Sequence, residues 1–142
     1  MNDLEISKLT NQVKKIADLV PEIKLIYLFG SQAVDRVNEE SDLDIAVFVE
    51  NQDEVSVRKL LVKFNQVGIN PINLDLSVVD LNSSPLFLLQ IIKKGKCLYK
   101  RKETLQASIE GKIMQRYYDT QHMRDIYSYY LDKSIKEGTY GR

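Results

Sequence analysis

Two short apolar runs joined by a polar stretch are the feature that most constrains the fold of this chain. The first run, 23–29, ends at Gly30 and Ser31, and after ten intervening residues Asp42 and Asp44 open the second run, 43–49. Apolar runs of this length next to turn residues predict buried strands. Residues i and i+2 of a strand point to the same face, so the carboxylates of Asp42 and Asp44 are expected to converge on one site.

The rest of the chain predicts an α/β (α+β) fold, a small β-sheet flanked by helices. Residues 72–79 alternate apolar and polar side chains, which puts Asp75 on the less apolar face of a third strand. Ser83 and Ser84 before Pro85 are typical of a helix start. The expected elements are, in chain order, a helix over 6–20, strands over 23–29 and 43–49, a helix over 55–67 closed by Gly68, a strand over 72–79, a helix over 85–94, and an edge strand over 97–99.

The chain divides into a unit of residues 1–102 and a helical tail, 103–142. Residues 1–100 carry 12 basic and 14 acidic groups, a net charge of −2, and residues 101–142 carry 8 and 6, a net charge of +2. Six of the eight tyrosines lie in the tail. Aromatic residues at helical spacing favour packing of this helix on its own sheet, and tyrosines are also enriched at protein interfaces. Both interpretations of the tail, self-packing and partner docking, stay open.

Composition excludes several classes of protein. A net charge of zero argues against a general nucleic-acid binder, which needs excess basic charge to displace phosphate counterions. Cys97 is the single cysteine and His122 the single histidine, too few ligands for a zinc site, and they are expected to be structural or exposed. Neither a signal peptide nor an apolar run long enough for a membrane span is evident. We therefore expect a cytoplasmic protein.

The spacing of the polar residues points to phosphate chemistry. Carboxylates held close together repel, and divalent cations such as Mg²⁺ turn that repulsion into attraction while binding substrate phosphates. Gly30 lets the backbone approach a phosphate closely, and Ser31 offers a hydroxyl and a backbone N–H at a helix start, where helix capping is the competing role. Asp75 is the expected third carboxylate. Its rival Asp80 lies at the end of the strand and is expected to cap the turn that follows.

With Gly30, Ser31, Asp42, Asp44 and Asp75 in this arrangement, residues 20–100 resemble the DNA polymerase β-type nucleotidyltransferase superfamily. Within it they are most similar to minimal nucleotidyltransferases, the MNT antitoxins of HEPN ribonuclease toxins. The resemblance implies the nucleotidyltransferase fold with a mixed sheet, two Mg²⁺ ions on the three aspartates, and ATP held by Gly30 and Ser31. It also implies transfer of AMP to a tyrosine of the HEPN toxin in a hetero-oligomeric complex.

The sequence departs from the family pattern in one place and leaves two other functions open. Many relatives carry a basic residue and a glycine soon after the Gly-Ser pair, whereas Val34 and Asp35 stand here with Arg36 beyond. The basic run of Lys93, Lys94, Lys96, Lys100, Arg101 and Lys102 is interpreted as a solvated edge, with a role near the nucleotide or an acidic partner as the alternative. The alternative functions are an antitoxin that acts by binding alone and a nucleotidyltransferase for a small molecule. Because the chain is too short for a separate acceptor domain, we expect a partner protein to present the acceptor.

Overall fold

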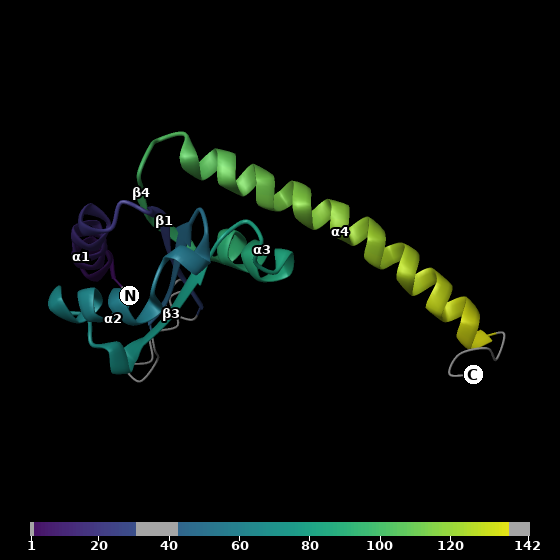
Figure 1. The fold of residues 1–142 in the computed structure, drawn as a ribbon, viewed down its shortest axis with the longest axis horizontal. Helices are drawn as coiled ribbons and strands as arrows, with labels where there is room; N and C mark the ends of the chain where they lie inside the picture. Colours follow the sequence, from purple (N-terminus) through teal and green to yellow (C-terminus); the bar gives the residue numbers. More distant parts are fainter. Residues whose placement is uncertain (1, 31–42, 137–142) are drawn as a thin grey trace.

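The structure, a computed structural model, describes residues 2–30 and 43–136 and contains a small sheet with helices on both faces (Figure 1). The elements in chain order are α1 (Asp3–Leu19), β1 (Ile23–Phe29), β2 (Leu43–Val49), the 3₁₀ turn η2 (Gln52–Glu54), α2 (Val57–Gln66), the 3₁₀ turn η3 (Pro71–Asn73), β3 (Leu74–Val79), α3 (Pro85–Lys94), β4 (Lys96–Lys100) and α4 (Leu105–Lys136).

The sheet is mixed, with strand order β3-β2-β1-β4. β1 pairs antiparallel with both β2 and β4, and β2 pairs parallel with β3. The C-terminal end of β1 therefore lies beside the N-terminal ends of the other three strands. We call this the Gly30 end of the sheet, and we call the other the Asp80 end because Asp80 follows β3 there. The expected mixed sheet with β4 at its edge is confirmed.

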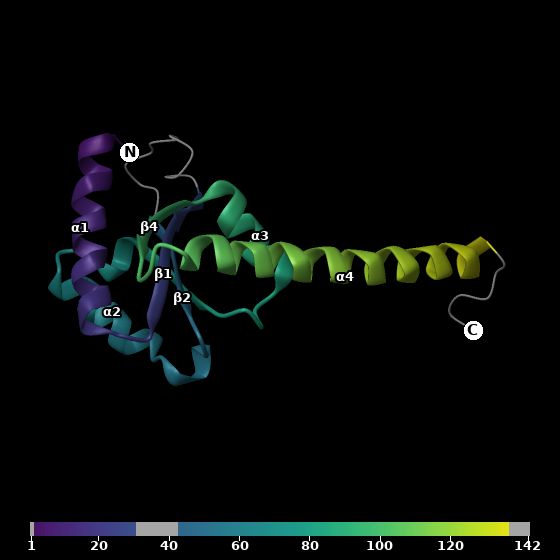
Figure 2. The same cartoon turned by 90° about the horizontal axis from the view of Figure 1, so that it is seen from above.

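Each face of the sheet has its own apolar core. On one face α1 and α2 pack against β-strand side chains that include Ile26, Leu28, Ile45 and Val47. On the other face α3 and the first part of α4 pack against Tyr27, Ala46 and Phe48 (Figure 2). The alternation of strand side chains between these two cores explains why both apolar runs are almost continuously buried.

Several element boundaries differ from the sequence prediction. α1 is Asp3–Leu19 instead of 6–20, α2 ends at Gln66 instead of 67, and β4 is Lys96–Lys100 instead of 97–99. Two further differences, both at element starts, have clear local reasons. The second helix starts after Ser56, whose hydroxyl oxygen accepts the Lys59 N–H at 3.3 Å, so Val55 lies outside it. The third strand starts at Leu74, because Asn70 and Pro71 form a capped 3₁₀ turn that leaves Ile72 84% exposed. Both expected starts, 55 and 72, were therefore wrong by two residues.

The expected start of the third helix is confirmed, but not through a serine cap bond. Ser84 occupies the cap position before Pro85, and its side chain makes no capping hydrogen bond. The Ser83 hydroxyl oxygen instead accepts the backbone N–H of Asp80 at 3.1 Å. The fixed φ of Pro85 at the first helical position, rather than a serine hydroxyl, is what favours the helix here.

α4 is packed on the body only in its first half. Ile109 and Ile113 are buried, and the Tyr27 hydroxyl donates a hydrogen bond to Glu110 Oε1 at 2.5 Å. Further on, the Arg116 guanidinium donates to the carbonyl oxygens of Leu81 and Ser83. Beyond this point the helix leaves the body (Figures 1 and 2). Self-packing of the tail is thus confirmed for its first half and wrong for its second.

Candidate functional site

Two of the predicted aspartates lie side by side at the Gly30 end of the sheet. Asp44 is the second residue of β2 and Asp75 the second residue of β3, and the two are direct partners in the parallel ladder. Neighbouring strands are about 4.8 Å apart, and paired residues point to the same face. Both carboxylates therefore lie on the face that α3 covers further along the strands. Asp75 is exposed and Asp44 half-buried, so the pair faces solvent at the rim of this face.

Gly30 lies against Asp44. Its φ of +77° belongs to the left-handed region that glycine adopts without a steric penalty. A Cβ atom at position 30 would lie 2.0 Å from Asp44 Oδ2 and 2.8 Å from Asp44 Cγ. The carboxylate of Asp44 thus occupies the space that any other residue would need. The glycine is required here both for the turn and for the position of the carboxylate.

The predicted metal-binding set is described only in part. Ser31 and Asp42 lie outside the described residues, so their placement stays a prediction. Among residues 2–30 and 43–136, no group of three His, Cys, Asp or Glu side chains is arranged to hold a metal ion. Asp44 and Asp75 supply two hard oxygen donors on one face, a donor set that suits Mg²⁺.

Comparison with known families decides the identity of this fold. A family model described as polymerase beta nucleotidyltransferase matches residues 11–104, which contain the whole sheet and end just before α4. The chain belongs to this nucleotidyltransferase family. Gly30, Asp44 and Asp75 all lie within the matched residues.

Individual proteins and solved structures are also similar to this chain. The protein adenylyltransferase MntA of Shewanella oneidensis is 33% identical over 89 residues, which is 61% of either chain. A chain of a toxin–antitoxin crystal structure with AMP-PNP superposes with a TM-score of 0.63 at 26% identity, covering 89% of this chain and 98% of that one. A structure of the tri-AMPylated HEPN toxin of S. oneidensis with its MNT antitoxin gives 0.56 at 25% identity, covering 90% and 98%.

The nucleotidyltransferase sheet also has a buried carboxylate at its other end, and its role is structural. Asp80 is 4% exposed, and its two side-chain oxygens accept the backbone N–H groups of Gln52 and Asn82 at 2.9 and 2.8 Å. These bonds fix the turns after β2 and after β3. The interpretation of Asp80 as a cap is confirmed.

The basic run of this nucleotidyltransferase separates into different roles. Arg101 is not part of a solvated edge, because its guanidinium donates to the carbonyls of Ala17, Val20 and Ile23 at the end of α1 and the start of β1. Lys100 forms a surface ion pair with Glu103 at 3.3 Å. Lys93, Lys94, Lys96 and Lys102 are exposed, as expected for a solvated edge.

Three of these lysines are near the Gly30 end of the sheet. Lys96 begins β4 and pairs with Leu28, two residues before Gly30. Lys93 and Lys94 form the last turn of α3, which returns from the Asp80 end to the Gly30 end to connect the parallel strands β3 and β4. The run of basic residues alone did not indicate that these lysines lie near the Gly30 end. The connection from β3 to β4 could have indicated it, because a crossover between parallel strands must end where the next strand begins.

Cys97 and His122 are structural and exposed, respectively, as expected. Cys97 packs in the core beneath α3, its Sγ donates to the carbonyl of Tyr99 at 3.4 Å, and burial raises the pKa of its thiol. His122 is exposed on α4. Within residues 2–30 and 43–136, no helix is both long enough and apolar enough to cross a membrane.

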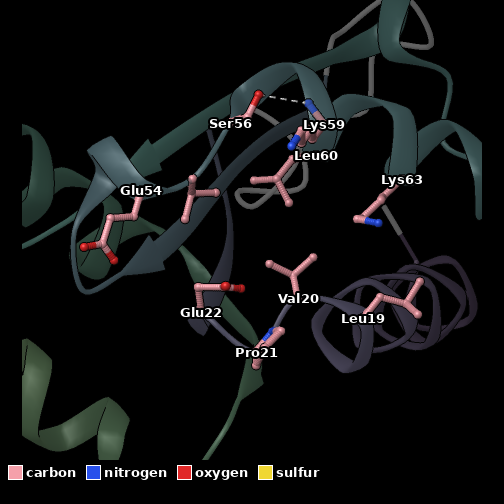
Figure 3. A pocket seen from close by; sticks show the side chains of 10 residues that line it. Leu19, Val20, Pro21, Glu22, Glu54, Ser56, Lys59, Leu60 and Lys63 are labelled. Carbon is pink, nitrogen blue, oxygen red and sulfur yellow. Dashed lines mark hydrogen bonds between the residues drawn. The ribbon is translucent and has the colours of Figure 1, made fainter.

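The pocket in Figure 3 is remote from the Gly30 end. It has a volume of about 270 Å³ and lies between the end of α1 and the start of α2, lined by Val20, Glu22, Glu54, Lys59 and Leu60 among others. β1 begins and β2 ends on this side, so the pocket belongs to the Asp80 end. Gly30, Asp44 and Asp75, the predicted site residues that the structure describes, do not line it, and its mixed acidic and basic lining gives no preference for a triphosphate.

Proposed function

We propose that this chain is an antitoxin that transfers AMP from ATP to a hydroxyl group, a tyrosine of a cognate HEPN ribonuclease toxin, and thereby silences the toxin in the cytoplasm. The observation that carries the proposal is the pairing of Asp44 with Asp75 beside Gly30. The similar MntA and the AMP-PNP and AMPylated-toxin complexes support the donor, the acceptor class and the partner.

Asp42, Asp44 and Asp75 are the residues that would hold Mg²⁺, and Gly30 and Ser31 would receive the β- and γ-phosphates of ATP. The chemistry that Mg²⁺ would supply when bound is neutralisation of phosphate charge and stabilisation of the leaving pyrophosphate. Asp75 is exposed next to Asp44 and can accept the proton of the incoming hydroxyl. The acceptor oxygen bonds to the α-phosphorus, the bond from this phosphorus to the bridging oxygen breaks, and pyrophosphate leaves.

Lys93 and Lys94 are our candidates for the role of the basic residue that many relatives carry soon after the Gly-Ser pair. They lie in the last turn of the helix that ends at the Gly30 end, and neither makes an ion pair with another described residue. Their positive charges also lie at the C-terminal end of α3, where the helix dipole is negative and favours cations. This position is compatible with binding phosphate. Replacing both by Gln is expected to raise KM for ATP about tenfold, the loss of a charged phosphate contact. Lys14→Gln/Lys15→Gln, on exposed α1 positions, is the matched control.

The decisive experiment combines the purified chain with labelled ATP, MgCl₂ and the HEPN protein encoded by the neighbouring gene. We expect label on a tyrosine of the toxin with the wild-type chain, loss of label with Asp42→Ala/Asp44→Ala, and full labelling with Asp18→Ala, an exposed aspartate of α1. Equal labelling by the wild type and the double variant would refute the mechanism.

The two alternative functions predict different results in the same assay. An antitoxin that acts by binding alone protects cells with the double variant as well as with the wild type. A small-molecule nucleotidyltransferase consumes ATP with an aminoglycoside and no toxin. Spectinomycin adenyltransferase shares the fold at a TM-score of 0.50 and 17% identity, and the match covers 59% of that longer chain.

A further inference from the structure

α4 crosses the sheet and continues past its edge strand. Its first half meets β1 through Glu110 and Tyr27, and then reaches the turn after β3 through Arg116. Since the strand order is β3-β2-β1-β4, the helix passes from the β4 side to the β3 side. Its second half, 118–136, projects away from the body in Figures 1 and 2.

The face that packs on the body continues as an apolar stripe on the projecting half. From Ile109 the stripe proceeds in alternating steps of four and three residues, which keep to one face of a helix. Its members are Ile109, Ile113, Arg116, Thr120, Met123, Tyr127 and Tyr130. The first two are buried, whereas Met123, Tyr127 and Tyr130 are 65%, 69% and 60% exposed. We call Met123, Tyr127 and Tyr130 the open stripe.

The open stripe is unfavourable in the free chain, because its large apolar side chains are exposed to water. Large apolar side chains gathered on one exposed face mark interaction sites, and tyrosines are frequent binding hot spots. The projecting half has only its own side-chain bonds, such as Arg124 to Thr120 and Gln121. A partner surface that covers the open stripe would supply the missing contacts.

The charged residues around the open stripe indicate which kind of partner surface fits it. Arg116 lies in the stripe and Arg124 beside one edge of it, exposed Asp119 lies beside the other edge, and Asp125 and Asp132 lie on the opposite side of the helix at helical spacing. The Arg124 guanidinium rests 5.0 Å from the centre of the Tyr117 ring and forms no salt bridge with a described residue. A complementary surface is therefore apolar with an acidic group facing Arg124.

We propose that the open stripe, with Arg124 at its border, docks the acceptor toxin through an apolar surface of that protein with an acidic group facing Arg124. This inference rests on the proposed function for the identity of the partner. A toxin seated there lies on the side of the sheet that α4 covers, the same side as exposed Asp75, although Asp75 lies at the other end of β3 from the Arg116 contact. Two structures whose matches cover 89% and 90% of this chain were solved as complexes of an antitoxin with its toxin. The proposal assigns the catalytic unit to residues 1–102 and the docking role to the projecting half of the tail, 118–136.

The helix provides its own matched control for a test. Tyr118 and Tyr129 are 70% and 64% exposed, like Tyr127 and Tyr130, but lie on the other side of the helix. We compare Tyr127→Ala/Tyr130→Ala with Tyr118→Ala/Tyr129→Ala in the full chain. Alanine favours helix, so neither variant is expected to lose α4, and circular dichroism verifies this.

Titration of the toxin against each variant, in the absence of ATP, measures the dissociation constant of the complex. The stripe variant is expected to weaken binding at least about tenfold, as for two interface tyrosines, and the control by less than about twofold. Arg124→Glu is expected to weaken binding, and Asp125→Lys to leave it unchanged. AMP transfer at saturating toxin should stay normal in all of them, since none touches the Gly30 end.

Equal loss in both tyrosine variants, or none in the stripe variant, would overturn the docking assignment. So would a stripe-dependent dimer of the free chain in light scattering, because it would make a second copy the occupant. If the toxin binds through the stripe but receives no AMP, docking stands and the proposed transferase function fails. If AMP transfer and toxin binding are both unaffected by the stripe variant, the function stands and docking fails.

Discussion

β3 carries a carboxylate at each end, and the two are opposites. Asp75 at the Gly30 end is exposed and lies in register with Asp44. Asp80 at the other end is almost fully buried and accepts two backbone N–H groups. A buried, fully bonded carboxylate stabilises the fold. An exposed carboxylate held next to another one gains nothing for the fold and is suited to bind a ligand.

Removal of the Asp75 charge should have the largest effect on function. Asp75→Asn keeps the shape of the side chain but removes a metal donor and a proton acceptor, so AMP transfer is expected to fall by at least about a hundredfold. The melting temperature should stay the same or rise, because the repulsion from Asp44 is relieved. Initial rates with labelled ATP and a thermal melt measure the two effects. An active Asp75→Asn enzyme would remove Asp75 from the site.

Asp80→Ala is the reciprocal experiment. It leaves the buried N–H groups of Gln52 and Asn82 without acceptors, so the free energy of unfolding is expected to drop by about 2–4 kcal/mol. AMP transfer per folded molecule should be normal. Urea denaturation measures the first effect, with the exposed Asp53→Ala as control. A stable but inactive Asp80→Ala protein would contradict the structural assignment.

A comparison of Gly30→Ala with Gly68→Ala separates the effect of backbone strain on stability from the effect of position 30 on activity. Gly68 shares the positive φ, at +96°, but a Cβ there would meet only Gln12 Nε2 at 3.2 Å. Both Gly→Ala variants should lose about 1–2 kcal/mol of stability through the left-handed backbone. At position 30 the added methyl also displaces the Asp44 carboxylate, so only this variant should lose AMP transfer. The same activity in both variants would disconnect Gly30 from the site.

Tyr27→Phe is expected to have the smallest effect, and it depends on pH. Burial, together with the hydrogen bond to Glu110, raises the pKa of Tyr27 well above its ordinary value of about 10. Above pH 10 the unfolded chain releases this proton and the folded chain retains it, so wild-type stability declines as pH rises. At pH 8 the variant should be about 1 kcal/mol less stable, and at pH 11 the difference should vanish. Urea titrations at both pH values measure this difference, and a constant one would contradict it.

The sequence predicted the strands 23–29 and 43–49 to the residue, because a glycine ends one apolar run and an aspartate precedes the other. It placed Asp75 on the correct face from alternation alone. It could not supply the register that pairs Asp75 with Asp44, since strand pairing depends on the whole sheet. Nor could the sequence show that the role of Arg101 differs from that of the lysines around it. The Arg101 guanidinium caps α1, whereas the lysines are exposed, and this difference lies in tertiary contacts that a run of basic residues does not reveal.

The pairing of β1 with β4 also sets an order of events during synthesis. Leu25 lies opposite Lys100, so the sheet cannot close until the chain has been made that far. Contacts between such distant residues form late in folding. α4 follows β4 directly, so its projecting half leaves the ribosome after all four strands. The nascent protein therefore completes its catalytic sheet before it can display the surface that we assign to the toxin, and a partner captured during translation meets an enzyme that is already assembled.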